Sequence, residues 1–281
     1  MSESLTLLLA ANRLERLDDN LFRGFDTWKA TERLFGGEVM SQSISAAQYT
    51  VAPGYHLHSF HSYFMRAGEA GRAVIYDVEN IRDGRSFLSR RVTARQHGHA
   101  IYSCQCSFQP EEEGLSHQHQ TTFPPGPEGL KSDRELFESI PNLPIKLANW
   151  PLEYRQTNPI WSQENPVSEP RNAIWIRADG EVPDELAVHQ QLLAFASDTH
   201  LLATSLRPHG VSFISPNLRS ATIDHSMWFH RPFRMDEWIL YEVYSPWAGN
   251  GRGLNFGRIY DREGNLIAST AQEGMVRVKP E

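Results

Sequence analysis

Three polar residues in the second half of the chain have side chains that could take part in chemistry at a site. Asp198 lies late in a stretch that predicts an apolar helix, Thr222 starts an expected strand, and Gln272 interrupts the last expected strand. Asp198 lies either at the wet edge of its helix or buried at a functional site, and the residues alone leave both open. The ordinary alternatives are a β-branched strand residue for Thr222 and a solvent-facing side chain for Gln272.

Signatures of other chemistries are missing from the sequence. There is no Gly-x-Ser-x-Gly nucleophile elbow and no Gly-x-x-x-x-Gly-Lys-Ser/Thr phosphate loop. His56, His58 and His61 lie close together, but no Asp or Glu completes a recognisable ligand set beside them. We therefore expect neither a metal site nor a cofactor.

Composition excludes several classes of protein. The 281 residues carry 27 Lys and Arg against 34 Asp and Glu, a net charge of −7, which disfavours nucleic-acid binding. No apolar run reaches the roughly 18–20 residues of a membrane span. The first residues lack a basic leader, and the last do not form a Ser-Lys-Leu address. With only Cys104 and Cys106 as cysteines, these features predict a cytoplasmic protein without disulfides.

The elements that must position the three residues follow a plan that occurs twice. In the first half, Gly36-Gly37 opens a helix of small residues that ends near residue 48. Strand-like runs follow at 56–66, 73–82, 86–96 and 100–109. The second half predicts a strand at 173–177, a helix at 183–202, and strands at 224–233, 238–247, 252–261 and 266–278. An additional apolar stripe from Leu7 to Leu17 predicts an opening helix.

Residue matches between the halves favour a duplication. His61-Ser62 resembles His225-Ser226, and Gly98 matches Gly264 at a similar offset. Two copies of a sheet wrapped around one helix is the preferred interpretation, with two unrelated α+β domains as the alternative. We expect a first domain at 1–115, a proline-rich connector at 116–150, and a second domain at 151–281. The connector is expected to contain one short helix.

The chain resembles the acyl-CoA thioesterase II family in several motifs. In the first half these are Phe35-Gly36-Gly37, residues 58–64, Tyr76-Asp77-Val78-Glu79 and residues 82–87; in the second half they are Ala196-Ser197-Asp198, Arg207-Pro208-His209-Gly210, residues 221–230 and residues 268–274. The resemblance implies an α+β double hotdog fold, in which two tandem antiparallel sheets each wrap around a central helix. His200, just after the acid, is more polar than the usual residue there.

The resemblance also implies an activity, hydrolysis of acyl-CoA to free fatty acid and coenzyme A. In the family an Asp, a Thr or Ser, and a Gln hold the hydrolytic water, and the matching residues here are Asp198, Thr222 and Gln272. The internal repeat places His58 opposite Thr222, so we expect His58 to bind substrate at the acyl-CoA entrance. Candidates for contacts with the coenzyme A phosphates are Arg66, Arg82, Arg85 and Arg252.

The first half is not expected to form a second site of the same kind. The repeat places Cys106 opposite Gln272, and the helix before it has no Asp opposite Asp198. Glu38 stands too early in that helix to be equivalent. A histidine and a cysteine can catalyse acyl transfer when paired, but we prefer the interpretation that His58 and Cys106 do not form such a catalytic pair and that this mirror site is mainly structural.

Two other functions are considered. A non-catalytic acyl-CoA-binding hotdog protein would not need Asp198, Thr222 and Gln272 together. A hotdog enoyl-CoA hydratase would need an Asp-x-x-x-x-His loop, which Asp224-His225 does not reproduce. Because hotdog sheets tend to pair at their edges, we also expect a homo-oligomer, a dimer or tetramer.

Overall fold

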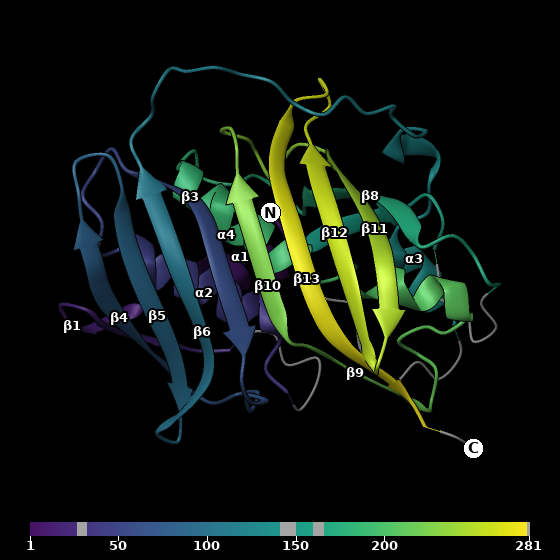
Figure 1. Cartoon of the computed structure of the whole chain (residues 1–281), viewed down its shortest axis with the longest axis horizontal. Coiled ribbons are helices and arrows are strands. Elements are labelled where there is room, and N and C mark those ends of the chain that lie inside the picture. Colours follow the sequence, from purple (N-terminus) through teal and green to yellow (C-terminus); the bar gives the residue numbers. More distant parts are fainter. Residues whose placement is uncertain (27–32, 141–149, 160–165, 280–281) are drawn as a thin grey trace.

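One continuous antiparallel sheet runs through both halves of the protein, with two helices behind it in the view of Figure 1. The helices are α2 (Gly36–Gln48) and α4 (Leu186–Ser197), which pack against each other. The computed structural model describes residues 1–26, 33–140, 150–159 and 166–279. Within these ranges, no helix has the length and apolar character that crossing a membrane requires.

The elements follow the duplicated plan along the chain. The first half consists of α1 (Glu3–Ala11), β1 (Glu15–Asp18), β2 (Leu21–Gly24), α2, β3 (His56–Phe64), β4 (Val74–Asp83), β5 (Leu88–Gln96) and β6 (His99–Gln109). The connecting part contains η1 (Pro127–Gly129) and α3 (Asp133–Glu138). The second half consists of β7 (Leu152–Gln156), β8 (Arg171–Ala178), α4, η3 (Leu202–His209), β9 (Leu218–Thr222), β10 (Asp224–Phe229), β11 (Ile239–Gly249), β12 (Arg252–Tyr260) and β13 (Leu266–Val278).

The order of the strands in the sheet is mirrored about its middle. It reads β1-β2-β4-β5-β6-β3-β10-β13-β12-β11-β8-β7, with β9 on β13, so β4-β5-β6-β3 in one half corresponds to β11-β12-β13-β10 in the other. This arrangement agrees with a double hotdog built by duplication. The two expected sheets are joined by the pairing of β3 with β10, for example Ser62 opposite His225. Because this edge pairing occurs within the chain, it no longer argues for an oligomer.

Small side chains let α2 pack closely on its neighbours. Met40 and Ile44 are fully buried, and two buried serines of the helix, Ser41 and Ser45, hydrogen-bond to Asn12. Ser41 Oγ donates to Asn12 Oδ1 at 3.0 Å, and Ser45 Oγ donates to the Asn12 carbonyl at 2.6 Å. Buried hydroxyls with partners cost little, so this polar helix can lie in the core.

Three of the expected elements are placed differently. The helix expected at 183–202 is α4 followed by the separate 3₁₀ helix η3, and Pro183 precedes it. The stripe from Leu7 to Leu17 is divided between α1 and β1. Thr222 ends β9 rather than starting a strand. Before α4, Val182 N–H donates to Asp236 Oδ2 and fixes the chain ahead of the helix.

The expected equivalence of His61 and His225 is wrong by one residue. His61 is exposed, with Nδ1 3.1 Å from Ser226 Oγ, whereas His225 is fully buried. Side chains alternate between the two faces of a strand, so a shift of one residue exchanges the faces. Gly98 and Gly264, in contrast, occupy corresponding turns, both with a positive φ (77° and 87°) that favours glycine.

The connector passes over one end of the sheet before it reaches α3 (Figure 1). The short helix expected there is α3, with Ser132 at its N-cap and a capping box to Glu135. Residues 141–149 of the expected connector lie outside the described residues. The division at 1–115, 116–150 and 151–281 stays a prediction.

Candidate active site

Asp198, Thr222 and Gln272 meet at one point although they come from three elements. Asp198 Oδ1 accepts a hydrogen bond from Thr222 Oγ1 at 3.2 Å and another from Gln272 Nε2 at 2.8 Å. Gln272 Nε2 also donates to Thr222 Oγ1 at 3.2 Å. The carboxylate is thus the acceptor at the centre of a small hydrogen-bond network, which restricts the orientation of its side chain.

Each element holds its residue for a local reason. Asp198 is the C-cap of α4, where the helix ends and a side chain can turn toward the sheet. Thr222 is the last residue of β9 and lies opposite Gly274 on β13. Gln272 lies on β13 with its side chain fully buried, so the solvent-facing interpretation of this residue is wrong. The sheet therefore delivers the hydroxyl and the amide to the end of the helix.

The first half contributes the opening turn of α2. A β-carbon on Gly36 would lie 2.5 Å from Asp198 Oδ2, and one on Gly37 would lie 2.5 Å from the Phe195 carbonyl oxygen. Only glycine permits this approach. The Gly37 backbone N–H hydrogen-bonds the Asp198 carboxylate, as expected for an anion at a helix N-terminus. The site therefore needs both halves of the chain.

The surroundings of Asp198 make it more basic than an ordinary aspartate. Burial raises its pKa above the usual 3.8, while the hydrogen bonds from Thr222, Gln272 and Gly37 act in the opposite direction. The carboxylate nevertheless keeps some accessible surface, because it lines two cavities. Asp198 is therefore partly buried and faces these two cavities. A raised pKa with a specific set of donors is typical of a functional acid or base.

Two cavities meet at Asp198. One has a volume of about 570 Å³ and the other about 490 Å³, both within the range of small-molecule sites. They share Leu34, Gly36, Asp198 and Thr222 among their lining residues. The larger cavity contains a group of apolar and aromatic side chains beside polar and charged ones; the apolar and aromatic group includes Phe35, Phe137, Trp150, Leu152, Tyr154, Leu202 and Phe213.

The smaller cavity is distinguished by its charge. Arg33, Arg66, Arg252 and Arg277 line it, and Asp198 is the one acid in its wall among the described residues. Arg66 and Arg252 were expected near the coenzyme A phosphates, and the structure brings them to this cavity. Arg82 and Arg85 do not line either cavity, whereas Arg33 and Arg277 were missed. No sequence pattern singles out these two arginines, because only the folded sheet brings their segments together.

The histidine and cysteine expected from the repeat are not brought to this site. His58 lines neither cavity; its Nε2 lies 2.8 Å from Ser107 Oγ and its ring packs edge-on against Phe87. Cys106 is buried, with its sulfur 3.8 Å from that of Cys104. Among the described residues, no three His, Cys, Asp or Glu side chains are grouped as they would be around a metal ion.

Glutamines occupy the place that corresponds to the Asp198 network in the first half. There the C-terminal end of α2 meets the opening of α4, as the end of α4 meets the opening of α2 at Asp198. Gln191 Nε2 donates to Gln48 Oε1 at 2.7 Å, and Gln190 Nε2 donates to the Leu57 carbonyl at 2.7 Å. Amides can brace two helices, but they cannot accept a proton from water at neutral pH.

The glycine pair was quoted in sequence only as part of a motif. The contact of this pair with Asp198 was not predicted. Two glycines at the start of a buried helix are nevertheless a detectable signal of a close approach, because glycine is a poor helix former. Thr222 and Gln272 both hydrogen-bond Asp198; that the three residues hold a hydrolytic water stays a prediction. The amide of Gln272 lies behind the carboxylate and does not line either cavity.

Comparisons with known proteins agree with this geometry. Residues 148–275 match a family described as acyl-CoA thioesterase, and residues 26–109 match the acyl-CoA thioesterase N-terminal domain. Acyl-coenzyme A thioesterase 8 of Mus musculus is 41% identical over 98% of this chain and 90% of its own length. Acyl-CoA thioesterase 2 of Haemophilus influenzae is 37% identical over 99% of each chain. The crystal structure of an acyl-CoA thioesterase II from Mycobacterium marinum superposes with a TM-score of 0.80 at 36% identity, covering 98% of both chains. The chain belongs to the acyl-CoA thioesterase II family.

Proposed function

We propose that this protein hydrolyses acyl-CoA thioesters with Asp198 as the general base. The observation that carries the proposal is the convergence of Thr222 and Gln272 on Asp198 Oδ1 at the junction of two cavities. The ionised carboxylate takes a proton from a water molecule, which attacks the thioester carbonyl carbon. The tetrahedral intermediate then collapses as the carbon–sulfur bond breaks, and the proton held by Asp198 passes to the departing sulfur, so that the fatty acid and coenzyme A are released and the base is regenerated.

Thr222 and Gln272 act through the carboxylate in this proposal. Their donors keep Asp198 ionised and fix its orientation, opposing the effect of burial on its pKa. Because Gln272 is fully buried, it is a positioning residue rather than a direct contact of the substrate. The N-terminal end of α2, at Gly36 and Gly37, lies against the site, and its partial positive charge favours the oxyanion that forms on the thioester.

The two cavities divide the substrate between them. The aromatic and aliphatic lining of the larger cavity suits an acyl chain, because apolar surface is stabilised when it leaves water. The four arginines of the smaller cavity suit the phosphates of coenzyme A. The thioester then lies at the residues that both cavities share, next to Asp198.

The two alternative functions make different use of these residues. In a hydratase, Asp224 and His225 would have to act on substrate. Asp224 Oδ1 instead accepts from the Glu273 N–H at 2.9 Å, and burial lowers the pKa of His225 to about 3, so this ring is neutral. In a protein that only binds acyl-CoA, loss of the proton acceptor at Asp198 would leave the function unchanged, because binding requires no proton transfer.

Thiol release from a panel of acyl-CoAs tests the proposal. Asp198→Asn is near-isosteric and removes the base, which typically costs roughly 10²–10⁴-fold in rate. Asp224→Asn is the matched control, because this neighbouring carboxylate lines neither cavity. The proposal fails if the wild-type protein releases no thiol, or if Asp198→Asn retains the wild-type rate.

The cytoplasmic location and the homo-oligomer also stay proposals. The first rests on the low cysteine count. The second needs an interface other than the edge pairing that β3 and β10 already use within the chain. Sedimentation of the purified protein tests it directly, since a single species at 32.0 kDa would exclude an oligomer.

A further inference from the structure

One wall of the larger cavity comes from the segment between the two halves. Ser132, Asp133, Arg134 and Phe137 of α3 and its N-cap all line this cavity. Phe137 is only 8% exposed, so its ring is packed into the wall and not directed to solvent. A short helix outside the two repeats therefore limits the space beside Asp198.

A buried contact ties this wall to the end of α4. Asp133 Oδ2 lies 2.9 Å from His200 Nε2, and both side chains are almost fully buried. Asp133 Oδ1 also accepts from Gln156 Nε2 at 2.9 Å. His200 is two residues beyond Asp198. The same few contacts therefore hold both α3, which forms the wall, and the segment that carries Asp198.

Tyr154 reinforces the same connection. Its ring packs edge-on against that of His200, with centroids 5.0 Å apart, and its hydroxyl lies 3.1 Å from Thr199 Oγ1. Tyr154 also lines the cavity. Strand β7 thus supports the wall through Tyr154 and Gln156, whose side chains are both buried.

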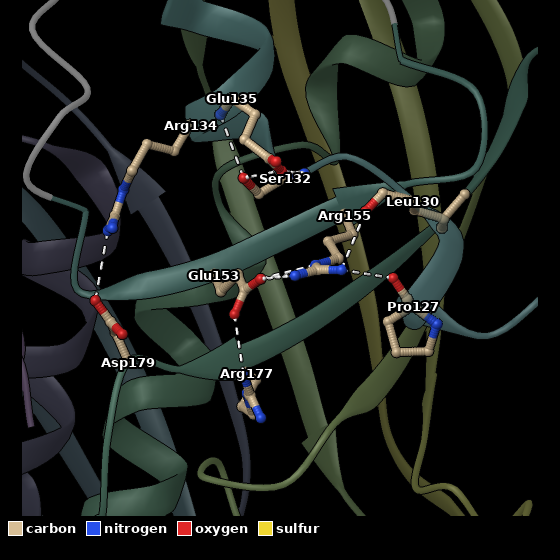
Figure 2. Close-up of polar contacts among 9 residues, drawn as sticks. All are labelled: Pro127, Leu130, Ser132, Arg134, Glu135, Glu153, Arg155, Arg177 and Asp179. Atoms are coloured by element: carbon tan, nitrogen blue, oxygen red, sulfur yellow. Dashed lines mark hydrogen bonds and ion pairs between the residues drawn. The ribbon is translucent and has the colours of Figure 1, made fainter.

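Polar contacts nearer the surface fasten the rest of the segment (Figure 2). Arg155 Nη1 donates to the carbonyl oxygens of Pro127 and Leu130, at 2.8 Å and 3.1 Å. Arg134 lies 3.4 Å from Asp179 at the other end. Exposed ion pairs such as Arg134–Asp179 contribute little, so the buried Asp133–His200 pair is the contact that best explains a fixed wall.

We propose that Phe137 sets the length of the acyl chain that the enzyme accepts, and that the Asp133–His200 pair positions this residue. The proposal rests on the proposed function, in which the acyl chain occupies the larger cavity. A wall that is fixed by buried partners cannot move aside for a longer chain. His200 is the residue whose polarity the sequence singled out, and the structure supplies its partner.

Selectivity between octanoyl-CoA and hexadecanoyl-CoA tests the role of Phe137. Phe137→Ala enlarges the cavity, and we expect it to raise the ratio of kcat/KM for hexadecanoyl-CoA to that for octanoyl-CoA by about tenfold, the scale of discrimination by methylene groups in apolar pockets. Leu136→Ala is the control, since this half-buried neighbour on α3 does not line the cavity. An unchanged ratio in Phe137→Ala with thiol release intact overturns the proposal. A wild-type protein without thiol release would instead overturn the proposed function.

A second pair of variants tests the positioning role. His200→Leu removes the partner of Asp133, whereas His200→Gln keeps a group that can hydrogen-bond it. We expect His200→Leu to shift the ratio in the same direction as Phe137→Ala, and His200→Gln to restore most of the wild-type selectivity. If both variants keep the wild-type ratio, the pair does not position the wall. Should His200→Leu not fold, Asp133→Ala removes the other partner of the pair; it should shift the ratio in the same direction as Phe137→Ala, and an unchanged ratio would contradict the positioning role.

Discussion

Gly36 lies so close to Asp198 that a β-carbon on the glycine would be 2.5 Å from Oδ2 of the acid. The two residues belong to different halves of the duplicated chain and are brought together where α2 packs on α4. The active site therefore lies at the interface between the two halves of the chain. Neither hotdog unit contains both the acid and the helix N-terminus that faces it.

Substitution of Gly36 by alanine tests this contact. The added methyl group must displace the carboxylate, and a displacement of about 1 Å can cost roughly 10²-fold in rate. We expect Gly36→Ala to lower kcat/KM by that order while the protein remains folded by circular dichroism. Gly114→Ala, where a β-carbon meets nothing within 4 Å, serves as the control. A fully active Gly36→Ala would show that the carboxylate position is not critical.

Loss of the donors to Asp198 is predicted to act on turnover. Thr222→Val and Gln272→Ala should each lower kcat more than they raise KM, because these residues hold the carboxylate and not the acyl chain. In steady-state assays the double variant should lose less than the product of the single losses, as expected for groups that act as one unit. Fully multiplicative losses would instead assign the two residues independent roles.

The pH dependence of kcat should report on the same network. A general base works in its ionised form, so the rate falls as pH drops through the pKa of Asp198. Burial raises that pKa above 3.8, and the acidic limb of the wild-type profile should therefore lie above this value. Thr222 and Gln272 lower the pKa, so removing either donor should move the limb to higher pH. A limb that moves to lower pH in Thr222→Val would contradict the assignment of the base.

His58 and Cys106 of the first half are predicted to take no chemical part in the reaction. The hydrogen bond to Cys104 and burial raise the pKa of the Cys106 thiol, which leaves it protonated and unreactive. Cys106→Ser should be nearly silent in thiol-release assays, and His58→Ala should cost less than Asp198→Asn. Mass spectrometry of the protein quenched during turnover should find no covalent adduct. An acyl group on Cys106 would overturn the water-based mechanism.

Much of the fold could be predicted because it is local. Period-two runs and turn glycines marked β3 to β6 and β10 to β13, and Gly98 and Gly264 have the positive φ of corresponding turns. The short strands β1, β7 and β9 escaped prediction, because four or five residues carry too little periodicity. The one-residue error at His61 and His225 has a similar origin, since a repeat in sequence does not determine which face of a strand points inward.

The residue types of the site were evident in the sequence, while their arrangement was decided by the tertiary structure. Asp198, Thr222 and Gln272 were singled out by their chemistry and by family resemblance. The surroundings of Asp198 depend on Gly36, which lies more than 160 residues earlier in the sequence. They also depend on the pairing of β3 with β10, which makes the sheet continuous. The cavity wall at Phe137 and its Asp133–His200 support likewise come from long-range packing. Side-chain periodicity reports only the face of an element, whereas burial and cavities arise from the contacts between elements that are distant in sequence.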